Sequence, residues 1–182
     1  MRVIAGTARG LRLAPVAPGV RPTSDRVRES LFNSLGQFFD GGEVLDLYAG
    51  TGALGIEALS RGCEQAVFVE KDGRAVAAIR ENLRRTGLEA RAEVIRADVN
   101  RALESLLDKA SLFRLILLDP PYKIAAAEAG NVLSRLPDLL VPEGQVVFES
   151  GDVSEDSTQI KRGITRRYGG TYVTIFERSG LL

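Results

Sequence analysis

Short apolar runs alternate with segments of helical periodicity through most of this chain, and the alternation constrains the fold more than any other feature. Apolar runs occupy 43–49, 65–72, 92–99, 114–121 and 144–150, and helical patterns occupy 53–62, 73–87, 100–110 and 125–140. This order is typical of a doubly wound, mostly parallel α/β sheet with helices on both faces. Two further runs, 160–169 and 170–179, are separated only by a turn, so they predict an antiparallel hairpin that completes a seven-stranded sheet.

The region before this alternation divides into two parts. Residues 1–20 alternate apolar and polar positions around glycine-containing turns, which predicts a small basic β-hairpin extension to a main domain over 21–182. Residues 18–39 then change to helical spacing, with Thr23 or Ser24 as the expected cap and Gly41–Gly42 as the expected end. The apolar positions of that helix are Val27, Leu31, Phe32, Leu35 and Phe38.

Composition excludes several kinds of chemistry. The 182 residues contain no histidine, which removes a Ser-His-Asp triad and any histidine-liganded metal, and we expect no metal site. Cys63 is the single cysteine, so no internal disulfide can form, and its apolar surroundings predict a buried thiol. No apolar stretch is long enough to span a membrane and no signal sequence is visible, so we expect a cytoplasmic protein, monomeric in solution.

Charge is balanced overall but not along the chain. The net charge is zero, yet residues 1–28 hold six arginines against one acid, Asp25, a local balance of +5. A basic N-terminal arm on a neutral body suggests a phosphate-rich partner, although a solvated charged face would show the same pattern.

A glycine-rich turn follows the first strand of the alternation. Gly50, Gly52 and Gly55 have the G-x-G-x-x-G spacing, and Glu70 ends the next strand about twenty residues later. This pattern is typical of dinucleotide binding and would suit a nucleotide-dependent oxidoreductase. Asp46, however, would face a bound pyrophosphate, whereas it suits a cationic ligand such as S-adenosylmethionine, with its sulfonium and ammonium groups. Asp98 ends the third strand, so three strands bring acids to one crevice.

The fourth strand ends in "LDPPY". Pro120 and Pro121 have fixed φ angles, so the Pro120 carbonyl and the Asp119 carboxylate are held as rigid acceptors. Two acceptors match the two N–H donors of an exocyclic amine, and they hold its nitrogen ready to attack an electrophilic methyl group. Tyr122 offers a flat face on which an extruded base can stack.

With these motifs in place, the chain resembles the RsmD-type methyltransferases. The resemblance runs nearly end to end, through "RVIAGTARGLRL", "RPTSDRVRESLFNSL", "LDLYAGTGALGIEALSRG", "FVEKD" and "LDPPY". It implies a Rossmann-like class I S-adenosylmethionine methyltransferase fold. It also implies methyl transfer to the exocyclic N2 of a guanine in small-subunit (16S) ribosomal RNA, in the assembled or partly assembled subunit.

The motifs and the resemblance together assign candidate residues to three roles. Asp119, Pro120 and Tyr122 hold the target amine and its base. The expected cofactor-binding residues are Asp46, Gly50, Gly52, Glu70, Asp98 and Thr23. The expected RNA contacts are Arg9, Arg12, Arg21, Arg26 and Arg28, and Phe32 is placed near cofactor or base. Core packing for Phe32 and helix capping for Thr23 are the alternative roles.

Other functions remain open on the sequence alone. The DPPY geometry does not distinguish guanine from another planar NH2 group, in adenine or cytosine of DNA or in a side-chain amide. A non-catalytic RNA-binding assembly factor that retains the fold is a further alternative.

Overall fold

The computed structural model describes residues 1–15, 25–121, 126–150 and 160–178. Its strands are β1 (Glu43–Leu47), β2 (Gln65–Glu70), β3 (Ala92–Arg96), β4 (Phe113–Leu118), β5 (Leu140–Ser150), β6 (Ile160–Tyr168) and β7 (Thr171–Arg178). Its α-helices are α1 (Asp25–Ser34), α2 (Ala53–Ser60), α3 (Gly73–Thr86), α4 (Val99–Asp108) and α5 (Ala126–Arg135). Two 3₁₀ turns, Glu89–Arg91 and Leu136–Leu139, precede β3 and β5.

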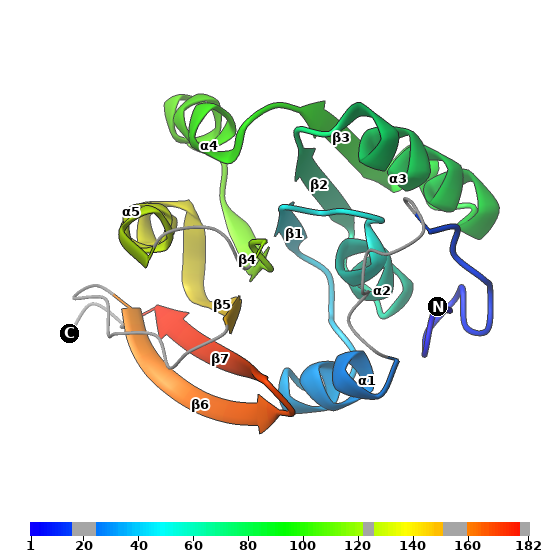
Figure 1. The fold of residues 1–182 in the computed structure, drawn as a ribbon, viewed down its shortest axis with the longest axis horizontal. Helices are drawn as coiled ribbons and strands as arrows, with labels where there is room; N and C mark the ends of the chain where they lie inside the picture. Colours follow the sequence, from blue (N-terminus) through cyan, green and yellow to red (C-terminus); the bar gives the residue numbers. More distant parts are fainter. Residues whose placement is uncertain (16–24, 122–125, 151–159, 179–182) are drawn as a thin grey trace.

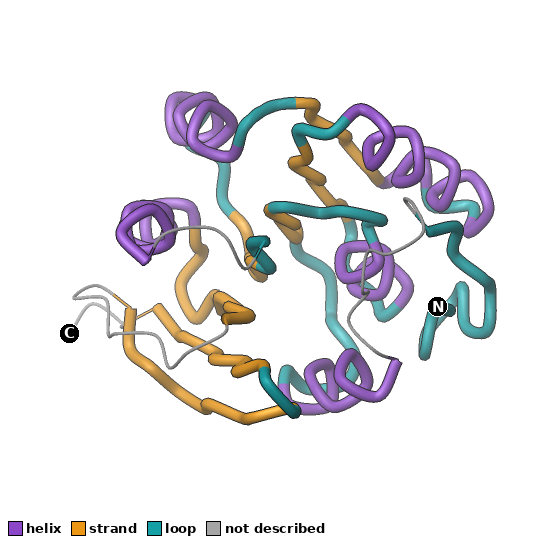
Figure 2. Tube along the Cα trace, viewed as in Figure 1, coloured by secondary structure: helices purple, strands orange, loops and turns teal. Residues whose placement is uncertain are grey.

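The strands form one seven-stranded sheet in the order β3-β2-β1-β4-β5-β7-β6 (Figures 1 and 2). The first five strands of the chain are parallel, whereas β7 pairs antiparallel to both β5 and β6. The predicted doubly wound sheet with an antiparallel C-terminal hairpin is therefore confirmed. None of the described helices is long and apolar enough to cross a membrane.

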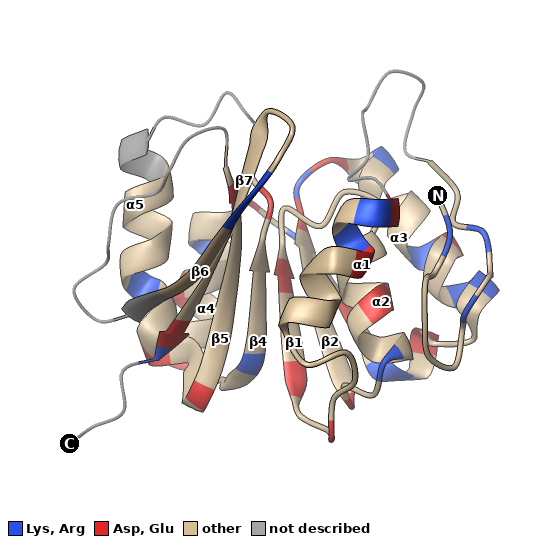
Figure 3. Ribbon diagram, turned by 90° about the horizontal axis from the view of Figure 1, so that it is seen from below, with Lys and Arg blue, Asp and Glu red and all other residues tan. Residues whose placement is uncertain are grey.

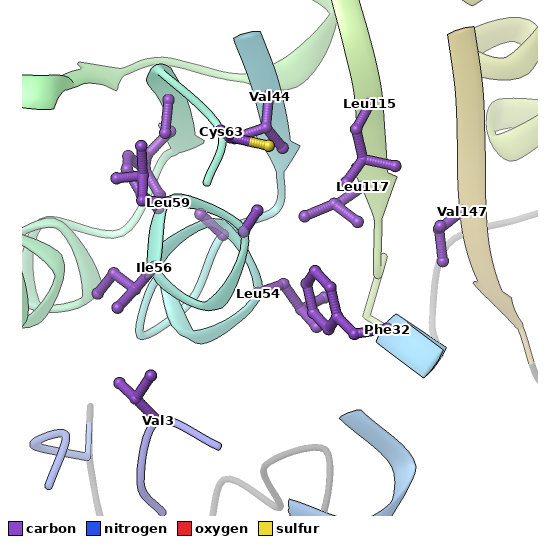
Figure 4. Packing of buried hydrophobic residues seen from close by; sticks show 14 of the residues in the cluster. Val3, Phe32, Val44, Leu54, Ile56, Leu59, Cys63, Leu115, Leu117 and Val147 are labelled. Atoms are coloured by element: carbon purple, nitrogen blue, oxygen red, sulfur yellow. The ribbon is translucent and has the colours of Figure 1, made fainter. Parts of the chain in front are cut away.

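Each face of the sheet has its own core. Helices α1, α2 and α3 cover one face, where Phe32, Ile56 and Leu117 belong to a cluster that also includes Val3 of the N-terminal segment (Figure 4). Helices α4 and α5 cover the other face, where Leu103 packs with residues of β4 and β5. The five-residue strand β1 is apolar on both faces, as a central parallel strand must be, except at its exposed first residue Glu43 and at Asp46.

Two details near the N-terminus differ from prediction. Residues 1–15 fold back on themselves, but the pairing is an isolated antiparallel bridge between Arg2 and Arg12, so the predicted hairpin is present in a minimal form. Helix α1 ends at Ser34, before the predicted Gly41–Gly42 end, because the chain turns at Gly36 and Gln37, both of which have positive φ. Phe38 lies beyond this turn and is 58% exposed, so the prediction that it belongs to the apolar positions of the helix was wrong.

Candidate active site at the carboxyl edge of the sheet

The carboxyl edge between β1 and β4 is the point at which the strand order reverses. From β1 the chain continues to β2 and β3 on one side, whereas β4 leads to β5 on the other. Open α/β sheets bind ligands at such a switch point, outside the carboxyl ends of the strands. Leu47 pairs with Leu118, so Asp46 in β1 and Asp119 just after β4 reach this edge on adjacent strands.

Asp46 is the buried acid of this edge. Its side chain is 2% exposed, and Oδ2 accepts a hydrogen bond of 2.9 Å from the backbone N–H of Gly55. Burial raises the pKa of Asp46 well above its ordinary value, and the nearby charges of Asp119 and Glu70 raise it further. Three carboxylates therefore interact at one place, and a cationic group there would relieve their mutual repulsion.

The glycine-rich turn fixes the backbone beside these acids. Gly50 and Gly52 have φ angles of 56° and 74°, in the left-handed region that glycine adopts without strain. The Gly50 N–H donates to Glu70 Oε2 at 2.9 Å, which joins the turn to the end of β2. A side chain at Gly55 would place its Cβ 2.4 Å from the Phe68 ring, so the third glycine allows α2 to pack closely on β2.

Asp98 follows β3 at the same edge, but its side chain has a local partner. It is the N-cap of α4 and accepts a hydrogen bond of 3.0 Å from the Asn100 N–H. The carboxylate is exposed, and the end of β3 lies next to the end of β2, where Glu70 stands. The structure thus brings Asp46, Glu70 and Asp119 into electrostatic contact and places Asp98 one strand farther out.

The residues after β4 are only partly described. Asp119 and Pro120 are half-buried at the switch point, and Pro121 is exposed. Tyr122 lies outside the described residues, as do Thr23 and Arg21 of the segment before α1.

Three of the predicted RNA-contacting arginines are exposed, namely Arg9, Arg12 and Arg26. Arg9 and Arg26 line a depression of about 270 Å³ between the N-terminal segment and α1, together with Arg2. Asp25 and Glu29 also line it, so its charge is mixed rather than uniformly basic.

The structure corrects the expected role of Arg28. Its side chain is fully buried, and Nη2 donates to the Arg2 carbonyl at 2.6 Å and to Asp25 Oδ1 at 2.7 Å. Burial lowers the pKa of Arg28, while the Asp25 carboxylate opposes that shift. Arg28 therefore joins α1 to the N-terminal segment and does not face RNA phosphates. Phe32 is also fully buried, which agrees with its alternative role in core packing, and the Arg61 guanidinium carbon lies 4.9 Å from its ring centroid.

Two residues beside the glycine-rich turn were not found from the sequence. Tyr48 directly follows β1 and has a φ of 59°, a conformation that is strained for a bulky side chain and that clusters at functional sites. Asn82 of α3 is fully buried, and its Nδ2 donates to the Thr51 carbonyl at 2.9 Å and to the Ala14 carbonyl at 3.1 Å. The available sequence signal for Asn82 was a polar residue among the apolar positions of an amphipathic helix.

Comparisons with known proteins agree with this geometry. A family model described as conserved hypothetical protein 95 matches residues 1–177. The chain is 42% identical over 184 residues to "Putative rRNA methyltransferase YlbH" of Bacillus subtilis, which covers 99% of this chain and 100% of that protein. It is 38% identical over 151 residues to ribosomal RNA small subunit methyltransferase D of Escherichia coli K12, covering 82% and 74% of the two chains.

Solved structures share the fold. A hypothetical protein of Thermus thermophilus is 33% identical with a TM-score of 0.80, covering 96% of this chain and 98% of that one. An RNA methyltransferase from Salinibacter ruber, solved in complex with S-adenosyl-L-homocysteine, has a TM-score of 0.68 over 89% and 96% of the two chains. Its identity is 19%, so this second likeness concerns the fold alone.

Proposed function

The chain belongs to the conserved hypothetical protein 95 family, which includes the RsmD-type rRNA methyltransferases, and on that premise we propose that it methylates small-subunit (16S) ribosomal RNA. The methyl donor is S-adenosylmethionine, and the acceptor is the exocyclic N2 of a guanine. The observation that carries the proposal is the meeting of Asp46 and Asp119 at the switch point, beside the glycine-rich turn.

The residues of this edge fit the proposed cofactor. S-adenosylmethionine supplies an electrophilic methyl group on a sulfonium sulfur, which is a good leaving group. The negative potential around Asp46 suits the cationic end of such a ligand, and the absence of a side chain at Gly50 leaves the backbone open to close approach. Glu70 and Asp98 are the candidates for the ribose hydroxyls and the adenine amine, and Thr23 for the methionine end.

Asp119 and Pro120 have the central role in transfer. The Asp119 carboxylate and the Pro120 carbonyl accept hydrogen bonds from the two N–H groups of the guanine amine, which holds the nitrogen lone pair out of the ring and toward the methyl group. After transfer the surplus amine proton leaves to Asp119 or to water. Tyr122 stacks on the extruded base. No histidine is needed for any of these steps.

The exposed arginines of the N-terminal segment supply the electrostatic contact with RNA. Arg9, Arg12 and Arg26, with Arg21, are proposed to neutralise phosphates next to the target loop. The partner is the small ribosomal subunit, assembled or partly assembled. The proposed setting is the cytoplasm, where ribosomal RNA is found, and the proposed active form is a monomer.

The titration of Asp46 gives a direct test of the cofactor site. The pKa of Asp46 is raised in the folded protein, so this carboxyl stays protonated there while it ionises in the unfolded chain. The stability of the unliganded protein therefore falls as the pH rises from the ordinary value of 3.8 toward the folded pKa. A cationic ligand favours the ionised form, so the affinity for S-adenosylmethionine should rise over that interval and binding should release a proton. Calorimetry in buffers of different ionisation enthalpy measures that proton, and Asp46→Asn should abolish its release.

The decisive test is labelled transfer. The purified protein is incubated with radiolabelled S-adenosylmethionine and small subunits from cells that lack the activity, and the digested nucleosides are separated. We expect label in N2-methylguanosine, and Asp119→Ala should slow transfer by about 100- to 1,000-fold while cofactor affinity stays within a few-fold. Asp108→Ala, at an exposed aspartate at the end of α4, is the matched control.

Label in another nucleoside would refute the guanine assignment, and cofactor binding without any transfer would favour another NH2 substrate. No cofactor binding would favour an assembly factor.

A further inference from the structure

Strand β6 is an edge strand whose end lies on the side of the candidate active site. It is parallel to β5, because both strands pair antiparallel with β7. The carboxyl end of β6 therefore points to the same edge of the sheet as Asp46 and Asp119. The sequence alone indicated only that this hairpin completes the sheet.

The strand pairings place this end level with the site. Leu118 pairs with Phe148, Phe148 with Thr174, and Thr174 with Thr165. Asp119 and Arg166 each follow one residue later, so they occupy the same row of the sheet, three strand spacings apart. At about 4.8 Å per spacing the two backbones are roughly 14 Å apart.

This end of β6 is basic and open to solvent. Arg166 and Arg167 stand at the carboxyl end of the strand, and residues 160–170 contain no acid. The side chains of Arg166 and Arg167 are both exposed. Among the ion pairs between described residues, neither arginine has a carboxylate partner.

Arg167 is also oriented by its neighbours. Its Nε donates to the Gly169 carbonyl at 2.9 Å, and its guanidinium carbon lies 5.6 Å from the centroid of the Tyr172 ring. The pairing of Arg167 with Tyr172 puts both on one face of the hairpin, and Arg166 on the other. Proteins that bind single-stranded RNA commonly combine a positive group, which contacts a phosphate, with an exposed aromatic ring, on which a base stacks.

A hydrogen bond fixes this end against α1. The hydroxyls of Tyr168 and Ser30 are 2.6 Å apart, so the end of β6 is held beside the helix whose first turn carries Arg26. In Figure 3 the basic end of β6 and the basic first turn of α1 both lie at the carboxyl edge, and Figure 1 shows the end of β6 next to α1. The end of β6 thus adds two exposed arginines to the basic position that α1 brings to this edge.

We propose that Arg166 and Arg167, with Tyr172, form a second RNA-backbone contact, which holds the single strand that flanks the target guanine. This inference rests on the proposed function and adds to it the course of the RNA across the site. Substrate bound at this contact would be held in position near Asp119, so the contact acts on substrate affinity rather than on the chemical step.

The test is the charge-reversed variant Arg166→Glu/Arg167→Glu in single-turnover methylation of small subunits. We expect the subunit concentration for half-maximal rate to rise at least tenfold, with the saturated rate within about threefold of the unaltered protein. The salt dependence of binding should weaken by about 1.4 in log–log slope, two contacts at roughly 0.7 each. Arg166→Lys/Arg167→Lys keeps the charge and should retain most of the affinity.

A matched control separates this effect from a general change of charge. Lys109→Glu/Arg114→Glu makes the same change at two exposed positions toward the amino edge of the sheet, and it should leave affinity and salt slope unchanged. Equal behaviour of the two reversed variants would overturn the proposal while leaving methylation by the unaltered protein, and with it the proposed function, intact. If the reversed variant fails to fold, Arg166→Gln/Arg167→Gln gives the same comparison, and unaltered affinity there would equally overturn the proposal. If the unaltered protein transfers no label, the proposed function itself fails.

Discussion

The N-terminal segment (residues 1–15) and the hairpin β6–β7 both border the candidate site, but they are attached to the domain in different ways. The N-terminal segment is held chiefly by side chains of α2 and α3 that bond to its backbone, namely Glu57, Ser60 and Asn82. The hairpin is held by the main chain, through six paired positions between β5 and β7.

This difference predicts where each region is sensitive to mutation. A main-chain ladder survives most side-chain changes, because its donors and acceptors belong to the backbone. A segment fixed chiefly by buried polar side chains depends on those few residues. Single substitutions should therefore release the N-terminal segment more readily than the hairpin.

The largest effect is expected for Glu57→Ala. Glu57 accepts hydrogen bonds from the Ile4 and Ala5 N–H groups and is paired at 2.7 Å with Arg61, and both charged side chains are 1% exposed. Its removal leaves the Arg61 guanidinium buried without its carboxylate, which should lower the free energy of unfolding by about 3–5 kcal/mol in urea titrations. Glu81→Ala breaks an exposed pair of similar spacing with Arg85 and should change stability little. Similar losses for the two variants would contradict the comparison.

A smaller but more informative effect is expected for Asn82→Ala. Asn82 bonds both the N–H and the carbonyl of Ala14 and also the Thr51 carbonyl in the glycine-rich turn, so it connects the N-terminal segment to the proposed cofactor site. The free energy of unfolding should fall by about 1–3 kcal/mol. Affinity for S-adenosylmethionine should fall with it, whereas Ser60→Ala, which affects only the segment, should leave that affinity unchanged. Cofactor binding unaffected by Asn82→Ala would disprove the connection.

A smaller loss of stability is expected for a substitution in the β6–β7 hairpin. Tyr168→Phe removes the half-buried hydroxyl that bonds to Ser30, and the free energy of unfolding should fall by about 0.5–1.5 kcal/mol in the same titrations. Ser30→Ala removes the other partner, and the double variant should lose no more than the larger single one. Additive losses would show that the two hydroxyls do not act on each other.

The smallest effect is expected for Thr165→Val. The Thr165 hydroxyl lies 3.2 Å from that of the buried Thr174, but valine fits a strand as well as threonine does, and the ladder between β6 and β7 is unchanged. We expect the free energy of unfolding to change by less than about 0.5 kcal/mol in urea titrations. A loss as large as that of Asn82→Ala would remove the distinction between the two regions.

The parts of the molecule that the sequence predicted are those set by local pattern and topology. Each strand of the parallel sheet is a short apolar run, and parallel strands necessarily bring their carboxyl ends together, so the sequence alone placed Asp46 and Asp119 at one edge. The pairing of β7 with β6 followed from the short turn that separates the two runs.

The parts that the sequence did not predict depend on contacts between distant residues. Arg28 looks like an RNA-facing arginine by charge, but its position is set by the Arg2 carbonyl, 26 residues away. The strained φ of Tyr48 has no local signature, and the position of Asn82 on the apolar face of α3 does not reveal that it bonds to Thr51 and Ala14. The alignment of Arg166 with Asp119 in one row of the sheet could be recognised only from the register across four strands.

The placement of β7 between β5 and β6 has a consequence for co-translational folding on the ribosome. Synthesis is vectorial, so β6 emerges before the strand that separates it from β5, and it has no neighbour in the sheet until β7 follows. A nascent chain halted before Thr171 would leave open the edge of β5, where Val146, Val147 and Phe148 are buried in the finished fold. Sheet closure, the covering of those apolar residues and the arrival of the basic end of β6 beside α1 are thus one late event, which a truncated translation product cannot complete.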